Sequence, residues 1–264
     1  MTGHDDRPRV TVERDGAVLL IGLDRPEKRN AADLRLLREL ASAYGELHRD
    51  PALRVGVVHA HGEHFSAGLD LADIGPRVGP QGLDAVPEDG LDPWGVRGER
   101  CAKPVVVALK GVSFTLSIEL ALASEIAVAS ADARFAQLEV SRAILPFGGA
   151  TLRFPARSGW GDAMRWMLTG DEFDAAEALR LGLVQEVVDG DPLPRALELA
   201  RRIAEQAPLA VQATLRNARI AAAQGERTAA GALPGELAEL MATEDARIGV
   251  EAFLRRERAE YLGR

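Results

Sequence analysis

The sequence predicts an α/β fold in which a sheet buried on both faces is flanked by helices. Short apolar runs rich in β-branched residues recur along the chain, and most are continuous, as in strands covered on both sides. Helix-like stretches lie between those runs, and strands that alternate with helices are typical of α/β proteins. Beyond about residue 191 the chain is rich in Ala, Leu, Glu and Arg, which predicts a helical C-terminal region.

The expected elements follow in this order along the chain. The apolar runs predict strands over residues 18–23, 54–59, 105–109, 126–129 and 183–188. Apolar residues recur at helical spacing between Leu34 and Leu47, which predicts a helix over residues 32–48. A shorter helix is expected over residues 118–125, and a further strand over residues 135–140.

Residues 75–98 interrupt this alternation with a long loop. They contain six glycines and four prolines, a density that prevents regular structure. A loop of this length inside a compact domain is either a lid on the substrate side or a plain mobile connector. The sequence favours neither interpretation over the other.

The C-terminal region is expected to form successive helices over residues 194–225 and 234–260, with breaks at Pro208 and Pro234. We therefore expect two units. The first is a core over residues 1–191. The second is a helical domain over residues 192–264 that packs on the core or on a neighbouring subunit.

Composition and charge exclude several classes of protein. Of the 264 residues, 47% are hydrophobic and 27% charged, an ordinary ratio for a globular protein. The formal net charge of −8 argues against nucleic acid or an anionic membrane as the main partner. No apolar run approaches the length of a membrane span, and the first residues lack the apolar segment of a secretory signal. The single cysteine, Cys101, excludes an internal disulfide and a thiolate metal cage, so we expect a cytoplasmic enzyme.

Glu119 is the first candidate for chemistry. It is the single charged residue between Lys110 and Glu125, in a helical stretch that is apolar almost all round. A buried carboxylate without a partner costs several kcal/mol or has a raised pKa, which suits an acid or base. The alternative is a carboxylate in the first helical turn that faces a rim and gains under about 1 kcal/mol from the helix dipole.

Two further segments are candidates. Glu139 lies near the end of an expected strand and before a Pro-Phe-Gly-Gly turn; the alternative is an edge-strand carboxylate paired with Arg142. Residues 66–68, Ser-Ala-Gly, follow an expected strand and suit a tight turn whose backbone N–H groups face a ligand. The alternative for that turn is an ordinary strand-to-helix connection capped by Asp70 or Asp73.

A metal site is not expected. His59, His61 and His64 lie close together, but their spacing is not that of a zinc helix and no cysteine accompanies them. On an extended segment the side chain of His64 would face away from the other two. The chain also lacks the glycine-rich nucleotide-binding motifs and the nucleophile elbow of serine hydrolases.

Taken together and in order, these segments resemble the crotonase (enoyl-CoA hydratase/isomerase) superfamily. The similarity covers residues 23–31, 65–71, 101–130, 135–151, 168–188 and 244–263. It implies a crotonase-like spiral of ββα units with a helical C-terminal trimerisation region, assembled as trimers or dimers of trimers. It also implies an acyl-CoA thioester substrate and no separate cofactor, since coenzyme A is part of the substrate.

By motif position, the resemblance implies an oxyanion hole formed by the backbone N–H groups of Leu69 and Leu116. The two catalytic carboxylates of family hydratases match Glu119 and Glu139. The resemblance assigns water activation to Glu119 and protonation of C2 to Glu139. Family isomerases usually keep only the later carboxylate, so the presence of both favours hydratase chemistry.

The resemblance also implies contacts to the substrate. Arg25 and Lys28, with the backbone of residues 69–72, are similar to the family's contacts to the nucleotide end of coenzyme A; the alternative is a solvated turn. Phe253 and Arg256 would reach the coenzyme A of a neighbouring subunit. The other implied substrate-binding positions are Ala67, Asp70, Leu71, Ala72 and Phe147.

Two positions depart from the family pattern. Most members carry three glycines where this chain has Thr115, Leu116 and Ser117, and a glycine where it has Phe147. A backbone N–H donor survives any side chain whose φ stays negative, so the oxyanion hole need not be lost. The added side chains are instead expected to narrow the acyl pocket or to alter the packing of the helix.

Three functions are consistent with these residues. The first is a 2-enoyl-CoA hydratase. The second keeps the fold but changes the reaction to double-bond isomerisation or acyl-CoA hydrolysis, because the oxyanion hole serves all of them. The third, motivated by the missing glycines, is a weakly active acyl-CoA-binding oligomer.

Overall fold

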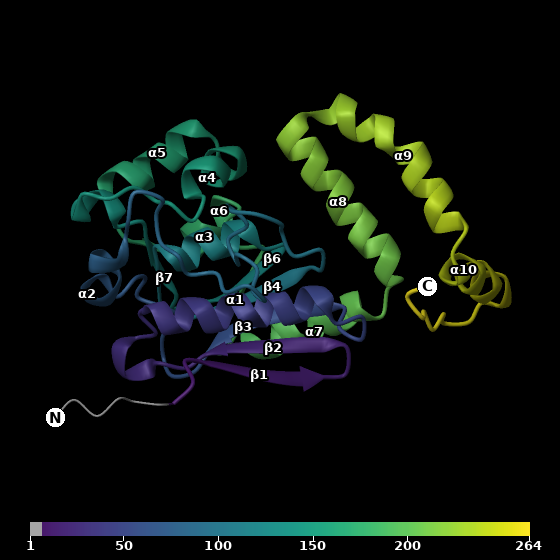
Figure 1. Cartoon of the computed structure of the whole chain (residues 1–264), viewed down its shortest axis with the longest axis horizontal. Coiled ribbons are helices and arrows are strands. Elements are labelled where there is room, and N and C mark those ends of the chain that lie inside the picture. Colours follow the sequence, from purple (N-terminus) through teal and green to yellow (C-terminus); the bar gives the residue numbers. More distant parts are fainter. Residues whose placement is uncertain (1–6) are drawn as a thin grey trace.

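Nine strands form two sheets in the residues described by this computed structural model, 7–264 (Figure 1). The six strands of the larger sheet are, in spatial order, β1 Val10–Asp15, β2 Val18–Leu23, β3 Val55–Ala60, β4 Val105–Leu109, β6 Ile126–Ser130 and β9 Glu186–Val188. The three strands of the smaller sheet are β5 Val112–Phe114, β7 Arg134–Ala136 and β8 Phe173–Asp174.

The larger sheet is covered on both faces. β1 and β2 pair as an antiparallel hairpin, and all later neighbours in this sheet pair in parallel. Consecutive residues of one strand are buried on opposite sides: Val58 belongs to the cluster that includes helix α1 (Leu34–Arg49), and Val57 to the cluster that includes helix α7 (Leu193–Ala204). This arrangement confirms the expected doubly buried sheet and explains why its strands are continuous apolar runs.

The chain alternates between the two sheets. β4 lies in the larger sheet and β5 in the smaller; helix α3 (Leu116–Ala123) follows, and β6 and β7 repeat the same alternation. Two strands in different sheets followed by a helix make one ββα unit, and their repetition confirms the expected spiral. The other helices of this core are α2 Leu71–Ile74, α4 Ala150–Ser158, α5 Trp160–Thr169 and α6 Ala175–Arg180, with 3₁₀ turns η1 Pro26–Lys28, η2 Gly75–Arg77 and η3 Glu139–Arg142.

The expected strand over residues 135–140 is wrong in its second half. β7 ends at Ala136, and Glu139 begins the 3₁₀ turn η3. The ladder ends there because its partner β5 stops at Phe114, where the chain turns into α3. Glu139 therefore does not pair with Arg142 on a strand edge; the Arg142 guanidinium donates to the Ser141 carbonyl and hydroxyl oxygens instead.

The C-terminal helices leave the core (Figure 1). α8 Pro208–Gln224, α9 Glu226–Met241 and α10 Glu244–Arg255 project beyond the sheets, whereas α7 packs on the larger sheet. Pro208 begins α8 as expected, but Pro234 lies inside α9 and does not break it. The break falls at Gly225, because its φ of +92° lies outside the helical region.

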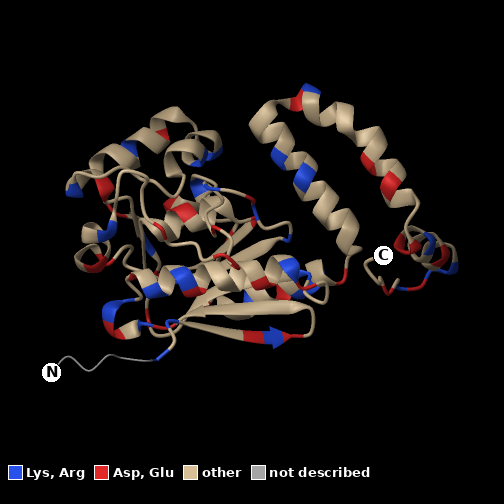
Figure 2. Cartoon of the chain, viewed as in Figure 1, with Lys and Arg blue, Asp and Glu red and all other residues tan. Residues whose placement is uncertain are grey.

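Ion pairs position the projecting helices. Figure 2 shows basic residues on α8 and acidic residues on α9, and Arg216 pairs with Glu236 across this hairpin at 2.9 Å. Arg219 connects α8 to the core, because it pairs with Glu125 at 2.7 Å and donates to the Cys101 carbonyl oxygen. Within residues 7–264, no helix combines the length and the apolar character needed to cross a bilayer.

Candidate active site

The turn at residues 66–69 leaves one backbone N–H group free. The Ser66 hydroxyl donates to the Asn30 carbonyl oxygen at 2.7 Å and accepts from the Gly68 N–H at 3.1 Å, which fixes the turn. The neighbours of Leu69 pair with Ala32, since the Ala32 N–H donates to the Gly68 carbonyl oxygen and the Asp70 N–H to the Ala32 carbonyl oxygen. The Leu69 N–H therefore points away from that bridge, and it donates to no group in the described part of the chain.

The second free amide belongs to Leu116. Leu116 is the first residue of α3, so its N–H has no acceptor within the helix and lies at the positive end of the helix dipole. The carbonyl oxygen of Leu116 accepts from the Trp94 indole N–H at 3.1 Å, which holds the start of the helix. Every residue of α3 is buried, as its apolar sequence predicts.

Thr115 occupies backbone geometry that usually belongs to glycine. Its φ is +50° and its ψ −104°, so the condition of a negative φ does not hold at this position. The side chain fits because it lies over Gly68, where an added Cβ would be only 2.0 Å from the Thr115 hydroxyl oxygen. The two residues that precede the free amides thus pack against each other, and the Leu116 N–H keeps its position at the helix start.

Glu119 is buried at the N-terminus of α4. Its side chain lies one turn into α3, and its Oε1 accepts from the Ala150 N–H at 3.0 Å. Its Oε2 is buried without a hydrogen-bond partner among the described residues. Burial raises the pKa of Glu119 to about 8, against the opposing hydrogen bond from Ala150 and with a smaller contribution from the charge of Glu139.

Gly148 explains how Glu119 reaches this position. A Cβ at Gly148 would lie 2.7 Å from the Glu119 Oε2 and 3.0 Å from the Trp94 Cδ1, so only glycine leaves room for the carboxylate. Gly149, with a φ of +104°, then directs the chain into α4. The Glu119 carboxylate therefore packs against the Pro-Phe-Gly-Gly turn.

Glu139 borders a cavity from the other side. Its Oε1 accepts from the Gln137 amide at 3.3 Å, and its Oε2 is buried without a partner among residues 7–264. Burial raises the pKa of Glu139 to about 7. Gln137 is fully buried and was not singled out by the sequence; its position directly after the short strand β7 and two residues before Glu139 is the signal that was available.

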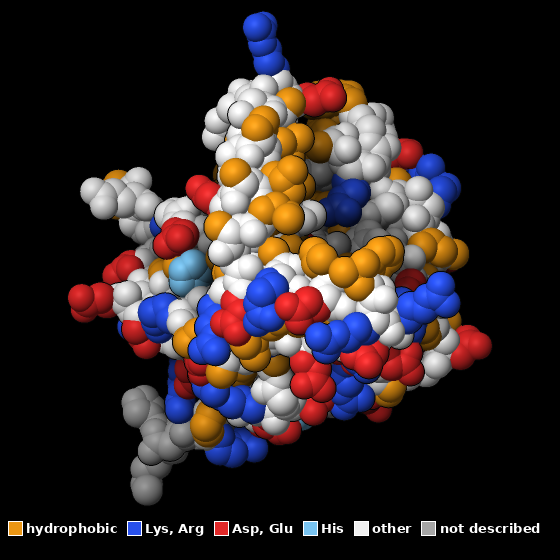
Figure 3. Space-filling view, turned by 90° about the vertical axis from the view of Figure 1, so that its right-hand side faces the viewer, with side chains coloured by type: hydrophobic (Ala, Val, Ile, Leu, Met, Phe, Trp, Pro, Cys, Tyr) orange, Lys and Arg blue, Asp and Glu red, His pale blue; other side chains and the backbone are white. Residues whose placement is uncertain are grey.

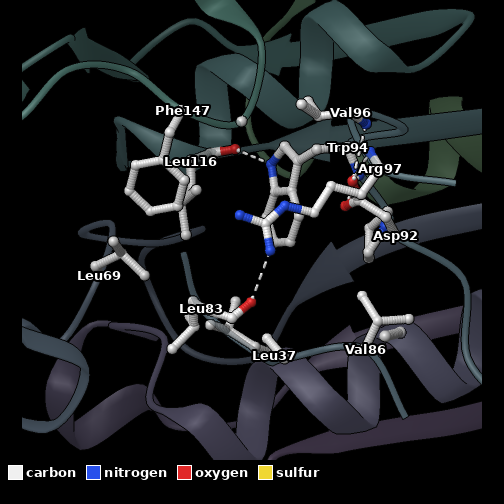
Figure 4. Close-up of a pocket in the computed structure, with 14 residues that line it drawn as sticks. Leu37, Leu69, Leu83, Val86, Asp92, Trp94, Val96, Arg97, Leu116 and Phe147 are labelled. Atoms are coloured by element: carbon white, nitrogen blue, oxygen red, sulfur yellow. Dashed lines mark hydrogen bonds between the residues drawn. The ribbon is translucent and has the colours of Figure 1, made fainter. Parts of the chain in front are cut away.

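Two cavities meet at Leu69, Leu116 and Phe147, which line both of them. The outer cavity has a volume of about 220 Å³ and is also lined by Ala67, Leu71, Thr115, Leu138, Glu139, Arg142 and Ile144. The inner cavity has a volume of about 70 Å³, and Figure 4 shows Phe147, Leu69 and Leu116 together at one side of it. The structure thus brings Leu69, Leu116 and Glu139 to one opening, with Glu119 packed against Gly148 in the wall of the inner cavity.

The glycine- and proline-rich loop forms much of the inner cavity. Its lining residues are Leu83, Ala85, Val86, Asp92, Pro93, Trp94, Val96 and Arg97. The segment thus lines a cavity next to the candidate site, which favours the interpretation as a substrate-side loop. Trp94 is a site residue that sequence reasoning did not single out, although one tryptophan in a segment of turn-forming residues was a visible signal.

Of the expected coenzyme A contacts, Leu69 and Leu71 line the outer cavity, whereas Arg25, Lys28, Asp70 and Ala72 line neither cavity. The Arg25 guanidinium is engaged within the protein: it donates to the Asp70 carboxylate and to the Ala31 carbonyl oxygen at 2.8 Å each. Lys28 is exposed in η1, and Ala72 is exposed in α2. Phe253 and Arg256, near the end of α10, line neither cavity of the site.

The histidines are used in packing and hydrogen bonding. The Thr11 hydroxyl lies 2.8 Å from the His61 Nε2, and the His64 Nδ1 accepts from the Val112 N–H at 3.3 Å. The described residues contain no cluster of His, Cys, Asp and Glu side chains with the geometry of a metal site.

The chain is similar in sequence and in fold to known proteins. A family model described as enoyl-CoA hydratase/isomerase matches residues 13–264. An enoyl-CoA hydratase of Mycobacterium tuberculosis is 30% identical over the whole of both chains, and the 2,3-dehydroadipyl-CoA hydratase of Escherichia coli is 32% identical over 97% of this chain and 99% of its own. The crystal structure of a probable enoyl-CoA hydratase/isomerase from Mycobacterium abscessus, 52% identical, superimposes with a TM-score of 0.94 over 97% of this chain and 99% of that one.

Proposed function

The chain belongs to the enoyl-CoA hydratase/isomerase family, the crotonase superfamily, and on that premise we propose that it adds water across the C2=C3 bond of a 2-enoyl-CoA thioester. The observation that carries this proposal is a pair of buried carboxylates: Glu139 lines a cavity together with Leu69 and Leu116, whose backbone amides are unused, and Glu119 packs behind Gly148 and lines neither cavity. The relatives named hydratases support it.

The two amides supply the electrostatic part of the reaction. When water attacks C3, negative charge develops on the thioester oxygen and an enolate forms. The N–H groups of Leu69 and Leu116 would donate to that oxygen, and the α3 dipole would add to the donation from Leu116. Loss of one such donor costs roughly 3–4 kcal/mol of transition-state stabilisation in other enzymes, so a pair is a large share of the required rate acceleration.

The carboxylates supply the proton transfers. One must be ionised to take a proton from water as its hydroxyl bonds to C3, and the other must be protonated to give a proton to C2. The pKa values raised to about 8 and about 7 leave the pair with at least one proton near neutral pH. Before substrate binds, that proton lies more on Glu119 than on Glu139, so the division of roles rests on the family resemblance and not on the order of the pKa values. We assign the base to Glu119 and the acid to Glu139, as the family resemblance implies. No electrons are transferred, so the proposed reaction needs only the thioester and water.

A hydration assay tests the proposal. Purified protein is mixed with crotonoyl-CoA and longer 2-enoyl-CoAs, and loss of the conjugated enoyl absorbance is followed. We expect Glu119→Gln and Glu139→Gln each to lower kcat by about 10²–10⁴, the usual contribution of a positioned acid or base. Glu198→Gln, on the exposed side of α7, is the control that should keep the wild-type rate.

The same assay separates the alternative reactions. Release of free thiol identifies hydrolysis. Hydration and isomerisation both remove the conjugated absorbance, and mass spectrometry of the product separates them, because only hydration adds the mass of water. If no enoyl chain is hydrated at high protein concentration, the hydratase proposal is wrong. If either Gln variant keeps nearly full activity on every substrate, the assignment of the carboxylates is wrong.

We also propose that the chain assembles as a trimer or a dimer of trimers through its C-terminal helices. Figure 3 shows hydrophobic side chains gathered on the face formed by these helices. The large hydrophobic residues of this part that are at least half exposed are Leu233, Leu237, Met241, Val250, Phe253, Leu254 and Leu262. An exposed apolar surface of this kind is typical of a subunit interface. Light scattering tests the proposal, and a strict monomer would contradict it.

The division into a core over residues 1–191 and a helical unit over 192–264 remains a proposal, with α7 packed on the sheet. A cytoplasmic location is proposed with it. Cys101 is buried and free, which suits a reducing compartment, and cell fractionation tests this.

A further inference from the structure

The inner cavity contains one cationic side chain in an apolar lining. Twelve of its fourteen lining residues carry no charge, and the two exceptions are Asp92 and Arg97. The Asp92 carboxylate already accepts three backbone N–H groups, from Trp94 at 3.0 Å, Val96 at 2.8 Å and Arg97 at 2.9 Å. The Asp92 oxygens are therefore directed at the loop backbone and make no ion pair with the Arg97 guanidinium, although the two side chains carry opposite charges in the same lining.

The Arg97 side chain is exposed at the edge of this cavity, and most of the donors of its guanidinium are free. Its Nη1 donates to the Leu83 carbonyl oxygen at 3.0 Å, the single side-chain hydrogen bond that Arg97 makes in the described part of the chain. Gly82 leaves space for it, since a Cβ there would lie 2.0 Å from the Arg97 Nη2. A guanidinium has five N–H donors in a planar fork, so several remain available. No carboxylate of residues 7–264 forms a salt bridge with it.

Figure 4 shows where this group lies relative to the proposed reaction centre. Leu69, Leu116 and Phe147 stand on one side of the inner cavity, and the guanidinium of Arg97 reaches across the cavity in front of the Trp94 indole. An acyl chain whose thioester oxygen is bound by the amides of Leu69 and Leu116 would extend toward that guanidinium. The far end of the chain would then meet a fixed cation.

We propose that Arg97 selects 2-enoyl-CoA thioesters whose acyl chain ends in a carboxylate, that is, monothioesters of unsaturated dicarboxylic acids. This inference rests on the proposed function and names its substrate class. A carboxylate would bind the free edge of the guanidinium in the bidentate geometry that arginine favours. A chain that ends in a methyl group would instead displace water from the cation without replacing its hydrogen bonds, which disfavours its binding.

Binding of saturated acyl-CoAs tests this inference independently of catalysis. Two thioesters of equal chain length, one ending in a carboxylate and one in a methyl group, are titrated calorimetrically into the protein. Neither can be hydrated, so the ratio of their Kd values reports only the cavity. We expect the carboxylate to bind about ten- to a hundredfold more tightly, the usual range for a charge-assisted hydrogen-bond pair.

Arg97→Met should abolish this preference and leave the methyl-ended thioester bound as well as before or better. Arg97→Gln, which retains a donor for the Leu83 carbonyl oxygen, should lose the preference as well and covers the case in which Arg97→Met does not fold. Arg38→Met is the matched control: Arg38 donates to the Asp84 carbonyl oxygen of the same loop but lines neither cavity of the site. It should keep the preference.

In Arg97→Met, a higher Kd for the carboxylate-ended thioester together with an unchanged or lower Kd for the methyl-ended one indicates that Arg97 recognises the carboxylate and does not merely support the loop. If Arg97 merely holds the loop, its replacement weakens both thioesters equally, and the proposal is overturned. It is also overturned if the wild-type protein binds the methyl-ended thioester as tightly as the carboxylate-ended one. If the carboxylate preference and its loss in Arg97→Met are observed but no enoyl-CoA is hydrated, the proposed reaction fails while the assignment of Arg97 stands.

Discussion

The replacement Gly148→Ala tests whether hydration depends on the position of the Glu119 carboxylate, and it leaves both glutamates in the sequence. The added Cβ would lie 2.7 Å from the Glu119 Oε2, 2.9 Å from its Cδ and 3.0 Å from the Trp94 Cδ1. Nonbonded carbon atoms prefer separations of about 3.5–4.0 Å, so the carboxylate must move by about 1 Å. Glu119 is 1% exposed and its Oε1 accepts from the Ala150 N–H at 3.0 Å, so this movement disturbs that hydrogen bond.

A displacement of this size should lower kcat/KM for hydration by about 10²-fold, because catalytic groups act only within narrow limits of geometry. Overpacking should also lower the free energy of unfolding by about 1–3 kcal/mol. The assay is the loss of enoyl absorbance, with thermal unfolding measured in parallel to establish that the variant is folded at the assay temperature.

Gly161→Ala is the matched control. Gly161 lies in α5 and an added Cβ meets nothing within 4 Å, so this variant should keep wild-type activity and gain about 0.5–1 kcal/mol from helix propensity. A folded Gly148→Ala variant with the wild-type kcat/KM would show that hydration does not depend on the position of the Glu119 carboxylate. The proposed role of Glu119 would then be refuted.

The raised pKa values of the two carboxylates and the backbone strain at Thr115 lead to two further predictions. Burial raises the pKa of Glu119 and Glu139 above the ordinary 4.5, so the folded chain retains protons that the unfolded chain has lost. The free energy of unfolding should therefore fall as pH rises from about 4.5 to about 8. Urea titrations at several pH values should show a weaker decline for Glu119→Gln than for the wild-type protein. Thr115→Gly removes the strain of a non-glycine residue at a φ of +50° and a buried hydroxyl that has no partner in the described chain, so it should raise Tm by about 2 °C. The hydration rate should stay nearly unchanged, because the Leu116 N–H remains. A lower Tm would show that the packing of Thr115 on Gly68 outweighs the strain.

Local sequence determined the elements whose energies are local. The continuous apolar runs at residues 18–23 and 105–109 became strands with those bounds, because a strand covered on both faces needs apolar residues at every position. The apolar stretch around Glu119 became the fully buried helix α3. The amino-acid sequence alone also indicates Glu119 and Glu139 as candidates, because an acidic residue in an apolar segment is costly unless it is used.

Tertiary structure decided what depends on segments distant in sequence. β7 stops before Glu139 because its partner strand stops, which the residues 135–140 do not encode. Arg25 donates to Asp70, 45 residues away, and this pairing is visible only once the turn at residues 66–69 has packed on η1. The inner cavity is formed by five separate segments: α1, the turn at Leu69, the loop that carries Arg97, the start of α3 and the turn at residues 147–148. The shape of this cavity depends on many small packing energies between those segments. A hydrophobic pattern within one segment does not predict how that segment packs against the others.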